Sequence, residues 1–238
     1  SNLQVAVLVT EEGCTWSEER RLSIIDMVSK GEEPEHRSMG TATIRKKSNP
    51  CIDGRCTIHM YDGDTKKVED LQKGDIVYGP QGNRVRICCI LKTVCSDGFA
   101  DMITFSSGLR ITPWHPIQSH GTTLCSQDLP WEFPCQVPGC AHGRVACNAL
   151  YSLVVQDDVS GEYECAIKIN DTWVISLGHG LSQKNAYHPY LGTRRVIDDL
   201  KCTVGWKDGL IIMSDNSFVR NPVTNLLDGI KLSNEITT

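Results

Sequence analysis

No stretch of the sequence is apolar over the roughly 18 residues that a membrane-spanning helix needs, so no transmembrane helix is expected. Long runs of one charge are also missing, and the 24 basic side chains nearly balance the 29 acidic ones. This balance favours neither a nucleic-acid partner nor an anionic membrane surface. The opening segment SNLQVAVLVTEE lacks the charged region and cleavage site of a secretory signal peptide. A small molecule or a protein is therefore the expected kind of substrate.

Cysteine is enriched, with 12 cysteines among 238 residues. This share is still below the roughly 8 to 10% that marks a small disulfide-stapled protein. Cys88 and Cys89 are adjacent within an apolar run, and Cys165 lies in a strand-like segment, where cross-links are awkward to form. We therefore expect reduced thiols that fill the core, and an intracellular, cytoplasmic protein.

The hydrophobic pattern divides the chain into a short first part and a longer second part. Residues 3–9 are typical of a strand and residues 17–30 of a helix that ends at Gly31, whereas residues 32–49 form a polar, charged flank. From residue 56 onward, short segments rich in Ile, Val, Thr and aromatic residues alternate with turn sequences such as DGD, PQGN and DDVSG. This pattern predicts an all-β domain of many short strands, in a barrel or a sandwich.

Two segments depart from this strand pattern. Residues 124–147 contain three prolines and are predicted to form a long irregular loop. Beyond Gly180, a further 58 residues carry mixed strand signals such as RRVIDDL and GLIIM. We interpret these residues as a C-terminal extension of the β-domain.

Two short motifs carry residue types that suit nucleophilic chemistry. Cys51 lies just upstream of a predicted strand, on a turn with Asp53 and Gly54 that would keep the thiol near the surface. In the motif ITPWHP, the prolines disfavour helix at Thr112 and His115, so a strand end or turn can direct both side chains towards one small target. Taken singly, each motif is more typical of a structural role: an ordinary partly buried thiol for Cys51, and a core histidine beside a hydroxyl bonded to local backbone for His115 and Thr112.

Together, in this order and in an all-β context, the two motifs resemble the Hint superfamily, which comprises inteins and hedgehog autoprocessing domains. The segment PCIDGRCTIHMYDGDTKKVEDLQKGD is similar to the opening block of the superfamily, TPWH to its second block, and LYSLVVQ with INDTWVISLGHG to its closing strands. With the stretch HPYLGTRRVIDDL, the sequence is most similar to the Hint module attached to von Willebrand factor A domains. The resemblance runs from about residue 51 to residue 215 and implies a horseshoe of short strands.

This resemblance implies three parts of the chain. Residues 1–50 would be an upstream flank that serves as the substrate, with a strand and a helix. Residues 51–180 would be the Hint domain, and residues 181–238 a C-terminal extension packed on it.

The resemblance also implies that the chain cleaves itself at the bond between Pro50 and Cys51. The Cys51 thiolate would attack the carbonyl carbon of Pro50 and move the upstream acyl group from nitrogen to sulfur, which gives a thioester. His115 would transfer a proton to the departing nitrogen, and Thr112 would donate to the scissile peptide or hold His115 in place. Water, another small nucleophile or a protein acceptor would then release the upstream polypeptide. The reaction requires neither a metal nor a cofactor.

Several positions depart from the pattern of the superfamily. Splicing inteins end in His-Asn, whereas the corresponding end here reads LGHGL, with Gly180 and Leu181 in place of the residues needed for cyclisation, so splicing is not expected. His179 takes the position of the penultimate histidine and is a candidate catalytic residue. Hedgehog domains use an acid after the third strand segment, where this chain has ILKTVCS with Cys95 in its neighbourhood, and Pro50 replaces the glycine that precedes their nucleophile.

Other functions stay open at this level. Cys125, Cys135, Cys140, His142 and Cys147 are residue types that bind zinc, although the spacing C-x4-C-x-H-x4-C is not a familiar one. A degenerate Hint domain that serves as a non-catalytic scaffold for protein interaction is a further alternative. A Cys/His protease acting on other chains would need a substrate groove, which short strands and one loop do not obviously supply.

Overall fold

The structure of the chain is a computed structural model, which describes residues 50–118, 125 and 129–231. The chain divides into two compact units, and all described residues belong to the second, Thr41–Thr238. The strand predicted at residues 3–9, the helix predicted at residues 17–30 and the polar flank lie outside the described residues.

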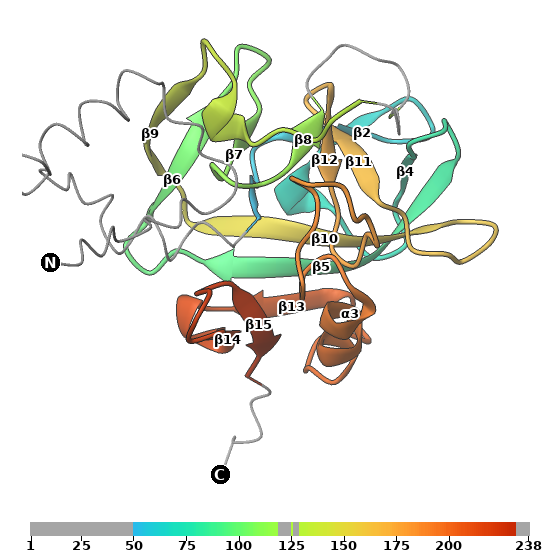
Figure 1. Ribbon diagram of the computed structural model, residues 1–238. Coiled ribbons are helices and arrows are strands. Elements are labelled where there is room, and N and C mark those ends of the chain that lie inside the picture. The colour runs from blue at the N-terminus through green and yellow to red at the C-terminus, as the bar shows by residue number, and fades with distance from the viewer. Residues whose placement is uncertain (1–49, 119–124, 126–128, 232–238) are drawn as a thin grey trace, which may run out of the picture. The chain divides into compact units, whose positions relative to one another are not determined.

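The described residues form an eight-stranded sheet in the order β13-β5-β10-β1-β7-β6-β9, with β4 paired to β5 beside this path (Figure 1). All pairs are antiparallel except β13 with β5, which is parallel. The strands are β1 (Ile52–Asp53), β4 (Ile76–Tyr78), β5 (Arg84–Val94), β6 (Phe99–Thr104), β7 (Arg110–Ile111), β9 (Ala141–Ala146), β10 (Ala149–Asp157) and β13 (Leu210–Met213).

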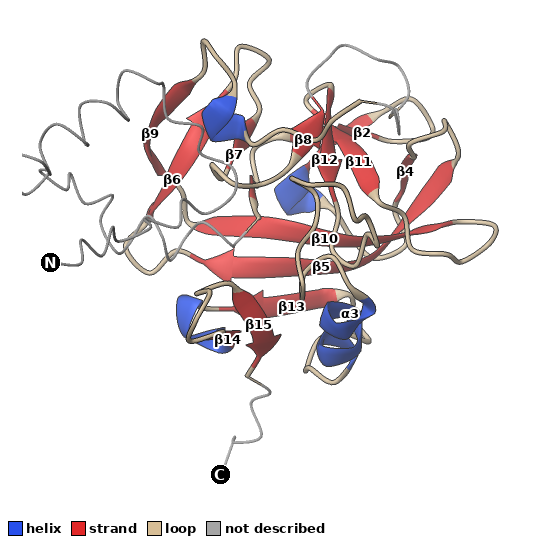
Figure 2. Cartoon of the chain, in the orientation of Figure 1, coloured by secondary structure: helices blue, strands red, loops and turns tan. Residues whose placement is uncertain are grey.

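A second sheet has five strands in the order β3-β2-β11-β12-β8, and a third consists of β14 and β15. Their bounds are β2 (Thr57–His59), β3 (Thr65–Lys67), β8 (Ile117–Gln118), β11 (Ala166–Ile169), β12 (Thr172–Ile175), β14 (Phe218–Arg220) and β15 (Leu227–Ile230). Helix is confined, within the described residues, to α3 (Arg194–Lys201) and the short 3₁₀ turns η1 (Val68–Asp70), η2 (Pro134–Gln136) and η3 (Asp215–Ser217), as Figure 2 shows.

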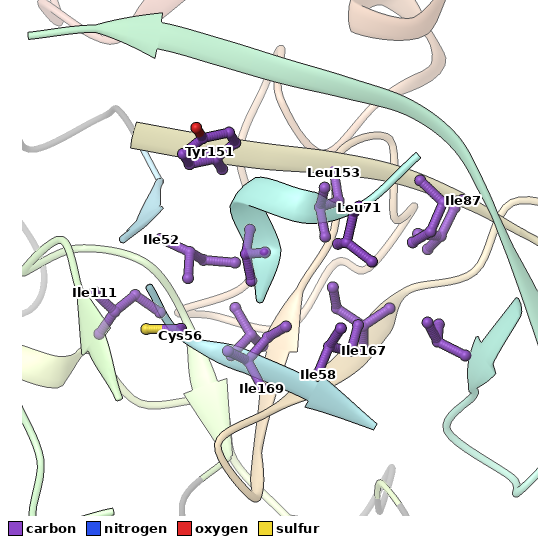
Figure 3. Packing of buried hydrophobic residues seen from close by; sticks show 14 of the residues in the cluster. Ile52, Cys56, Ile58, Leu71, Ile87, Ile111, Tyr151, Leu153, Ile167 and Ile169 are labelled. Carbon is purple, nitrogen blue, oxygen red and sulfur yellow. The ribbon is translucent and has the colours of Figure 1, made fainter. Parts of the chain in front are cut away.

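The long ladder between β5 and β10 lies at the centre of the core, and seven consecutive residues of β10 are buried, so both faces of this strand are covered. Alternate side chains of a strand point to opposite faces. The residues that face the main core are Ala149, Tyr151, Leu153 and Val155, which share a cluster with Ile58 of β2 and with Ile167 and Ile169 of β11. Figure 3 shows Tyr151, Leu153 and the three isoleucines of this cluster. On the opposite face, Leu150 packs near Cys51 and Val154 packs against the C-terminal segments. Ser152 lies on that face, between Leu150 and Val154.

The residues after 180 pack on the ladder rather than standing apart from it. Helix α3 buries Val196, Ile197 and Leu200, which share a cluster with Cys89 and Leu91 of β5. Strand β13 extends the large sheet by pairing with β5 from Leu210 to Met213. Residues 181–230 therefore complete the cover of the face of β5 and β10 that carries Ser152.

The prediction of an all-β fold of many short strands is confirmed, and the two larger sheets are open. The prediction of an irregular loop at 124–147 was wrong for its second half, since β9 (Ala141–Ala146) pairs with β6 throughout its length. Five of the six β9 residues are exposed and Val145 is half-buried, so the sequence AHGRVA lacks the apolar alternation that marks a strand. The segment is a strand because its main chain pairs with β6.

Candidate active site

The position of Cys51 follows from the place of β1 in the large sheet. Strand β1 lies between β10 and β7, and Ile52 pairs with Tyr151 on one side and with Ile111 on the other. The preceding residue, Cys51, therefore lies between the neighbours of those partners, which are Ser152 and Thr112. The sequence-based expectation of a thiol near the surface was wrong: Cys51 is 1% exposed, and its side chain lies in a cluster with Ala100, Met102 and Leu150.

Two main-chain groups of Cys51 are held by Thr112. The amide nitrogen of Cys51 donates to Thr112 Oγ1 at 3.0 Å, and the amide nitrogen of Thr112 donates to the carbonyl oxygen of Cys51 at 3.0 Å. The resemblance implied that the hydroxyl would donate to the scissile peptide or hold His115 in place. Towards the amide nitrogen of Cys51 the hydroxyl accepts instead. Thr112 thus fixes the direction of the N–H of the amide between Pro50 and Cys51.

Ser152 contacts both groups that would react in an attack on this amide, the thiol of Cys51 and the carbonyl group of Pro50. Its hydroxyl donates to the carbonyl oxygen of Pro50 at 2.6 Å, and its Oγ lies 3.4 Å from Cys51 Sγ. Ser152 is 5% exposed. The sequence analysis missed this residue, although one signal was present: a hydroxyl within the apolar strand segment LYSLVV.

His115 lies on the turn that connects β7 to β8, and its amide nitrogen donates to the carbonyl oxygen of Thr112 at 3.2 Å. His115 Nε2 lies 2.9 Å from the carbonyl oxygen of Ile175, and since a carbonyl only accepts, Nε2 carries the proton of the neutral ring. Nδ1 is buried and has no hydrogen-bond partner of standard geometry among the described residues. Burial lowers the pKa of His115 to about 4, which main-chain hydrogen bonding at Ile175 and Cys51 only partly offsets. The ring is therefore neutral at pH 7.

A cavity of about 110 Å³ adjoins Pro50. Its lining includes Ser152, His115, His179 and His188. His179 accepts a hydrogen bond at Nδ1 from the amide of Leu181, at 3.0 Å. Burial, followed by the nearby His188 and His115, lowers the pKa of His179 to about 4. The fold thus brings the predicted residue His179 to the same cavity as His115.

His188, which the sequence analysis did not single out, is the third histidine of the cavity. Its Nδ1 accepts from the amides of Tyr190 and Leu191, at 3.2 and 3.0 Å. Nε2 is buried and has no hydrogen-bond partner among the described residues. Burial is also the main cause that lowers the pKa of His188 to about 4.

The pocket of Cys51 is apolar on its remaining side. Its thiol packs with Ala100, Met102, Cys147 and Leu150, and Cys95 lies at the edge of this cluster. A hydrogen bond from Cys95 is the main cause that lowers the pKa of Cys147. Cys95 therefore places a further thiol at the edge of the cluster around Cys51.

The cysteines considered for zinc are dispersed over several parts of the fold. Cys135 and Cys140 pack against the main core, Cys147 lies beside Cys51, and Cys125 packs against a separate cluster around Trp131 and Trp173. His142 is exposed on β9. Among the described residues, no three His, Cys, Asp or Glu side chains are grouped so that they could hold a metal ion. In the same residues, no helix has both the length and the apolar character to cross a bilayer.

Comparison with known proteins identifies the family. A family model described as Vint, a Hint domain, matches residues 50–229, which is more than half of the chain. The DnaB intein from Synechocystis sp. PCC 6803 is 13% identical with a TM-score of 0.38, over 54% of this chain and 99% of the intein. The gp41-1 intein is 14% identical with a TM-score of 0.35, over 54% of this chain and 99% of that intein. No curated protein matches the sequence. The matched range includes Cys51, Thr112 and His115, and the match confirms the predicted superfamily: this chain belongs to the Vint family of Hint domains.

Proposed function

We propose that the domain cleaves its own chain between Pro50 and Cys51, by an acyl shift from nitrogen to sulfur that forms a thioester, and that it does not splice. The single observation that carries this proposal is the placement of Cys51 Sγ and the Pro50 carbonyl on one side chain, Ser152, with contacts of 3.4 and 2.6 Å. The substrate is the upstream polypeptide of the same chain. Membership of a Hint family supports autoprocessing as the general activity.

In the first step, Cys51 Sγ adds to the carbonyl carbon of Pro50 and the C–N bond to Cys51 then breaks. The attack is intramolecular, so the reacting groups start close together and the entropic part of the barrier is small. The nitrogen leaves as an amine only if it receives a proton. Because Thr112 already holds its N–H, the new proton has to arrive from another direction, and His115, beside the Cys51 main chain, is the residue we assign to deliver it.

In the second step, a nucleophile attacks the thioester and releases the upstream segment. The cavity beside Pro50, at about 110 Å³, is larger than the roughly 10 to 15 Å³ that one water needs. We propose water or a small amine or thiol as the acceptor. His179 and His188 are neutral at pH 7 and line this cavity, where either could accept a proton from the attacking group.

The proposal excludes splicing because Gly180 and Leu181 cannot cyclise as an asparagine would. Gly180 also has a φ of +72°, a conformation that suits glycine and strains other residues. The downstream chain is therefore expected to stay attached to the domain after cleavage.

Incubation of the purified chain with hydroxylamine or dithiothreitol tests this proposal. We expect release of the segment that ends at Pro50, and complete loss of release in Cys51→Ala. Cys56→Ala is the matched control: Cys56 is equally buried, at 2% exposure, packs in the main core, and is expected to leave cleavage intact. Cleavage at another bond, or cleavage that survives in Cys51→Ala, would contradict the proposal.

A further inference from the structure

Ser152 forms a continuous hydrogen-bonded link between the attacking atom and the oxygen of the bond to be attacked. The carbonyl oxygen of Pro50 can only accept, so the single proton of the Ser152 hydroxyl lies in the 2.6 Å contact with it. In the 3.4 Å contact with Cys51 Sγ, the donor is then the thiol and the acceptor is Ser152 Oγ. The order is thiol, hydroxyl, carbonyl, with every proton pointing towards the Pro50 oxygen.

We infer that Ser152 is a catalytic residue which relays the thiol proton of Cys51 to the carbonyl oxygen of Pro50 as the sulfur attacks. The inference rests on the proposed function and names how its nucleophile is activated.

The surroundings of Cys51 favour this route over attack by a preformed thiolate. The thiol is 1% exposed among apolar side chains, and an ion buried in such surroundings is costly unless it is paired. In a Cys–His ion pair the partner would be an imidazolium, but burial lowers the pKa of His115 to about 4, so that ring is neutral at pH 7. Attack coupled to proton transfer through Ser152 forms no isolated charge.

The step balances in atoms and electrons. The S–H bond of Cys51 breaks as the bond from Sγ to the Pro50 carbonyl carbon forms. The thiol proton moves to Ser152 Oγ, whose own proton moves to the carbonyl oxygen, and the π electrons of the C=O bond become the new O–H bond. The product is a neutral tetrahedral adduct, and Ser152 ends as a hydroxyl again.

Collapse of the adduct also balances. The hydroxyl proton returns through Ser152 to solvent in the adjoining cavity as the C=O bond re-forms, while His115 delivers one proton, drawn from solvent, to the departing nitrogen. The net result is one proton moved from sulfur to nitrogen. Ser152 is suited to both stages because it borders the cavity as well as the two reacting groups.

The geometry also gives Ser152 a second effect in the same step. Charge develops on the Pro50 oxygen during attack, and a donor already in place at that oxygen stabilises it without reorganisation. Loss of one such donor typically costs about 10² to 10³ in rate. The relay also lets the neutral thiol react, so its loss should change how the rate depends on pH, whereas loss of a hydrogen-bond donor alone should not.

Cleavage by the full chain, at saturating hydroxylamine between pH 6 and 8, tests this inference. We expect Ser152→Ala to lower the rate by about 10²-fold or more. Without the relay the reaction needs the thiolate, so the slope of log rate against pH should become more positive by about one unit. Ser152→Thr keeps the hydroxyl and is expected to restore most of the rate and the slope of the unmodified chain.

Thr93→Val is the control for loss of a buried hydroxyl, since Thr93 lies on the adjacent strand β5, is 3% exposed and pairs with Leu150. It should leave both rate and slope unchanged. A rate in Ser152→Ala within about threefold of the unmodified chain would overturn the relay, and so would a lower rate with an unchanged slope. In either case, cleavage that still depends on Cys51 would uphold the proposed function. Failure of the unmodified chain to cleave, or cleavage by Cys51→Ala, would instead overturn the proposed function and the relay with it.

Discussion

The amide nitrogen of Cys51 donates to the hydroxyl of Thr112, 61 residues further along the chain, at 3.0 Å. The bond follows from the register of β1 with β7, which sets the two residues opposite each other. Since this N–H belongs to the amide that we propose to break, the hydroxyl holds the leaving nitrogen in one orientation before the attack.

Thr112→Val is therefore expected to slow cleavage by about tenfold or more, because it removes the acceptor and leaves a buried N–H without it. The rate of hydroxylamine-dependent release measures the effect. Thr172→Val makes the same change at a buried threonine on β12 and should cleave at the rate of the unmodified chain. Equal rates for the two variants would count against a role for the Thr112 hydroxyl.

Loss of the imidazole of His115 should slow the first step by around 10²-fold or more, as loss of a general acid does. His142→Ala is the comparison, since this histidine is exposed on β9 and outside the cavity. The single-turnover rates of both variants, measured at saturating hydroxylamine, test this role of His115. A His115→Ala chain that cleaves as fast as His142→Ala would remove His115 from the mechanism.

The rate of cleavage should rise as the pH falls from 8 to 6. With a pKa of about 4 for His115, the fraction of imidazolium, the form that donates a proton, increases about tenfold for each pH unit in this window. The measurement is the single-turnover rate at several pH values under saturating nucleophile. A rate that increases with pH would indicate that proton donation by His115 does not limit the reaction.

Stability should fall in mild acid. The pKa of His115, His179 and His188 is lowered to about 4 in the folded chain, against about 6.5 when unfolded, so between these values the unfolded chain binds more protons. The stability is fully present above pH 6.5 and is lost as pH falls towards 4, by about 1.4 kcal/mol per pH unit for a fully buried histidine such as His115. Urea unfolding at pH 7 and pH 5 measures the loss, which should be smaller in His115→Gln. Equal losses in both chains would show that His115 is not the source.

Sequence patterns were sufficient for the all-β character and for three residues that meet at the site. Local signals carried these predictions: turn sequences between short apolar segments, the cysteine that opens the first block, and the prolines around His115. The chemistry of Cys51, Thr112 and His115 is a property of residue type, and the resemblance placed the three in one site. The resemblance also predicted His179 as a candidate catalytic residue, and His179 lines the same cavity as His115.

What the sequence did not provide depends on contacts between distant strands. Ser152 meets Cys51 only because β1 pairs with β10, and no local pattern specifies which strands pair. The same pairing contributes to the burial of Cys51. Strand β9 was not predicted because its residues are exposed, and only its main-chain hydrogen bonds to β6 define it as a strand. The direction of the Thr112 hydrogen bond likewise depends on register and not on residue type.

The chemical form of the new carboxyl end at Pro50 tests the central claim most directly. A thioester transfers its acyl group to hydroxylamine, so mass spectrometry of the released segment should find Pro50 as a hydroxamate, beside a second fragment that begins at Cys51 with a free amine. The Cys51→Ala chain should yield neither fragment. A free acid at Pro50 that forms at the same rate with and without hydroxylamine, or fragments that end elsewhere, would contradict a thioester between Pro50 and Cys51.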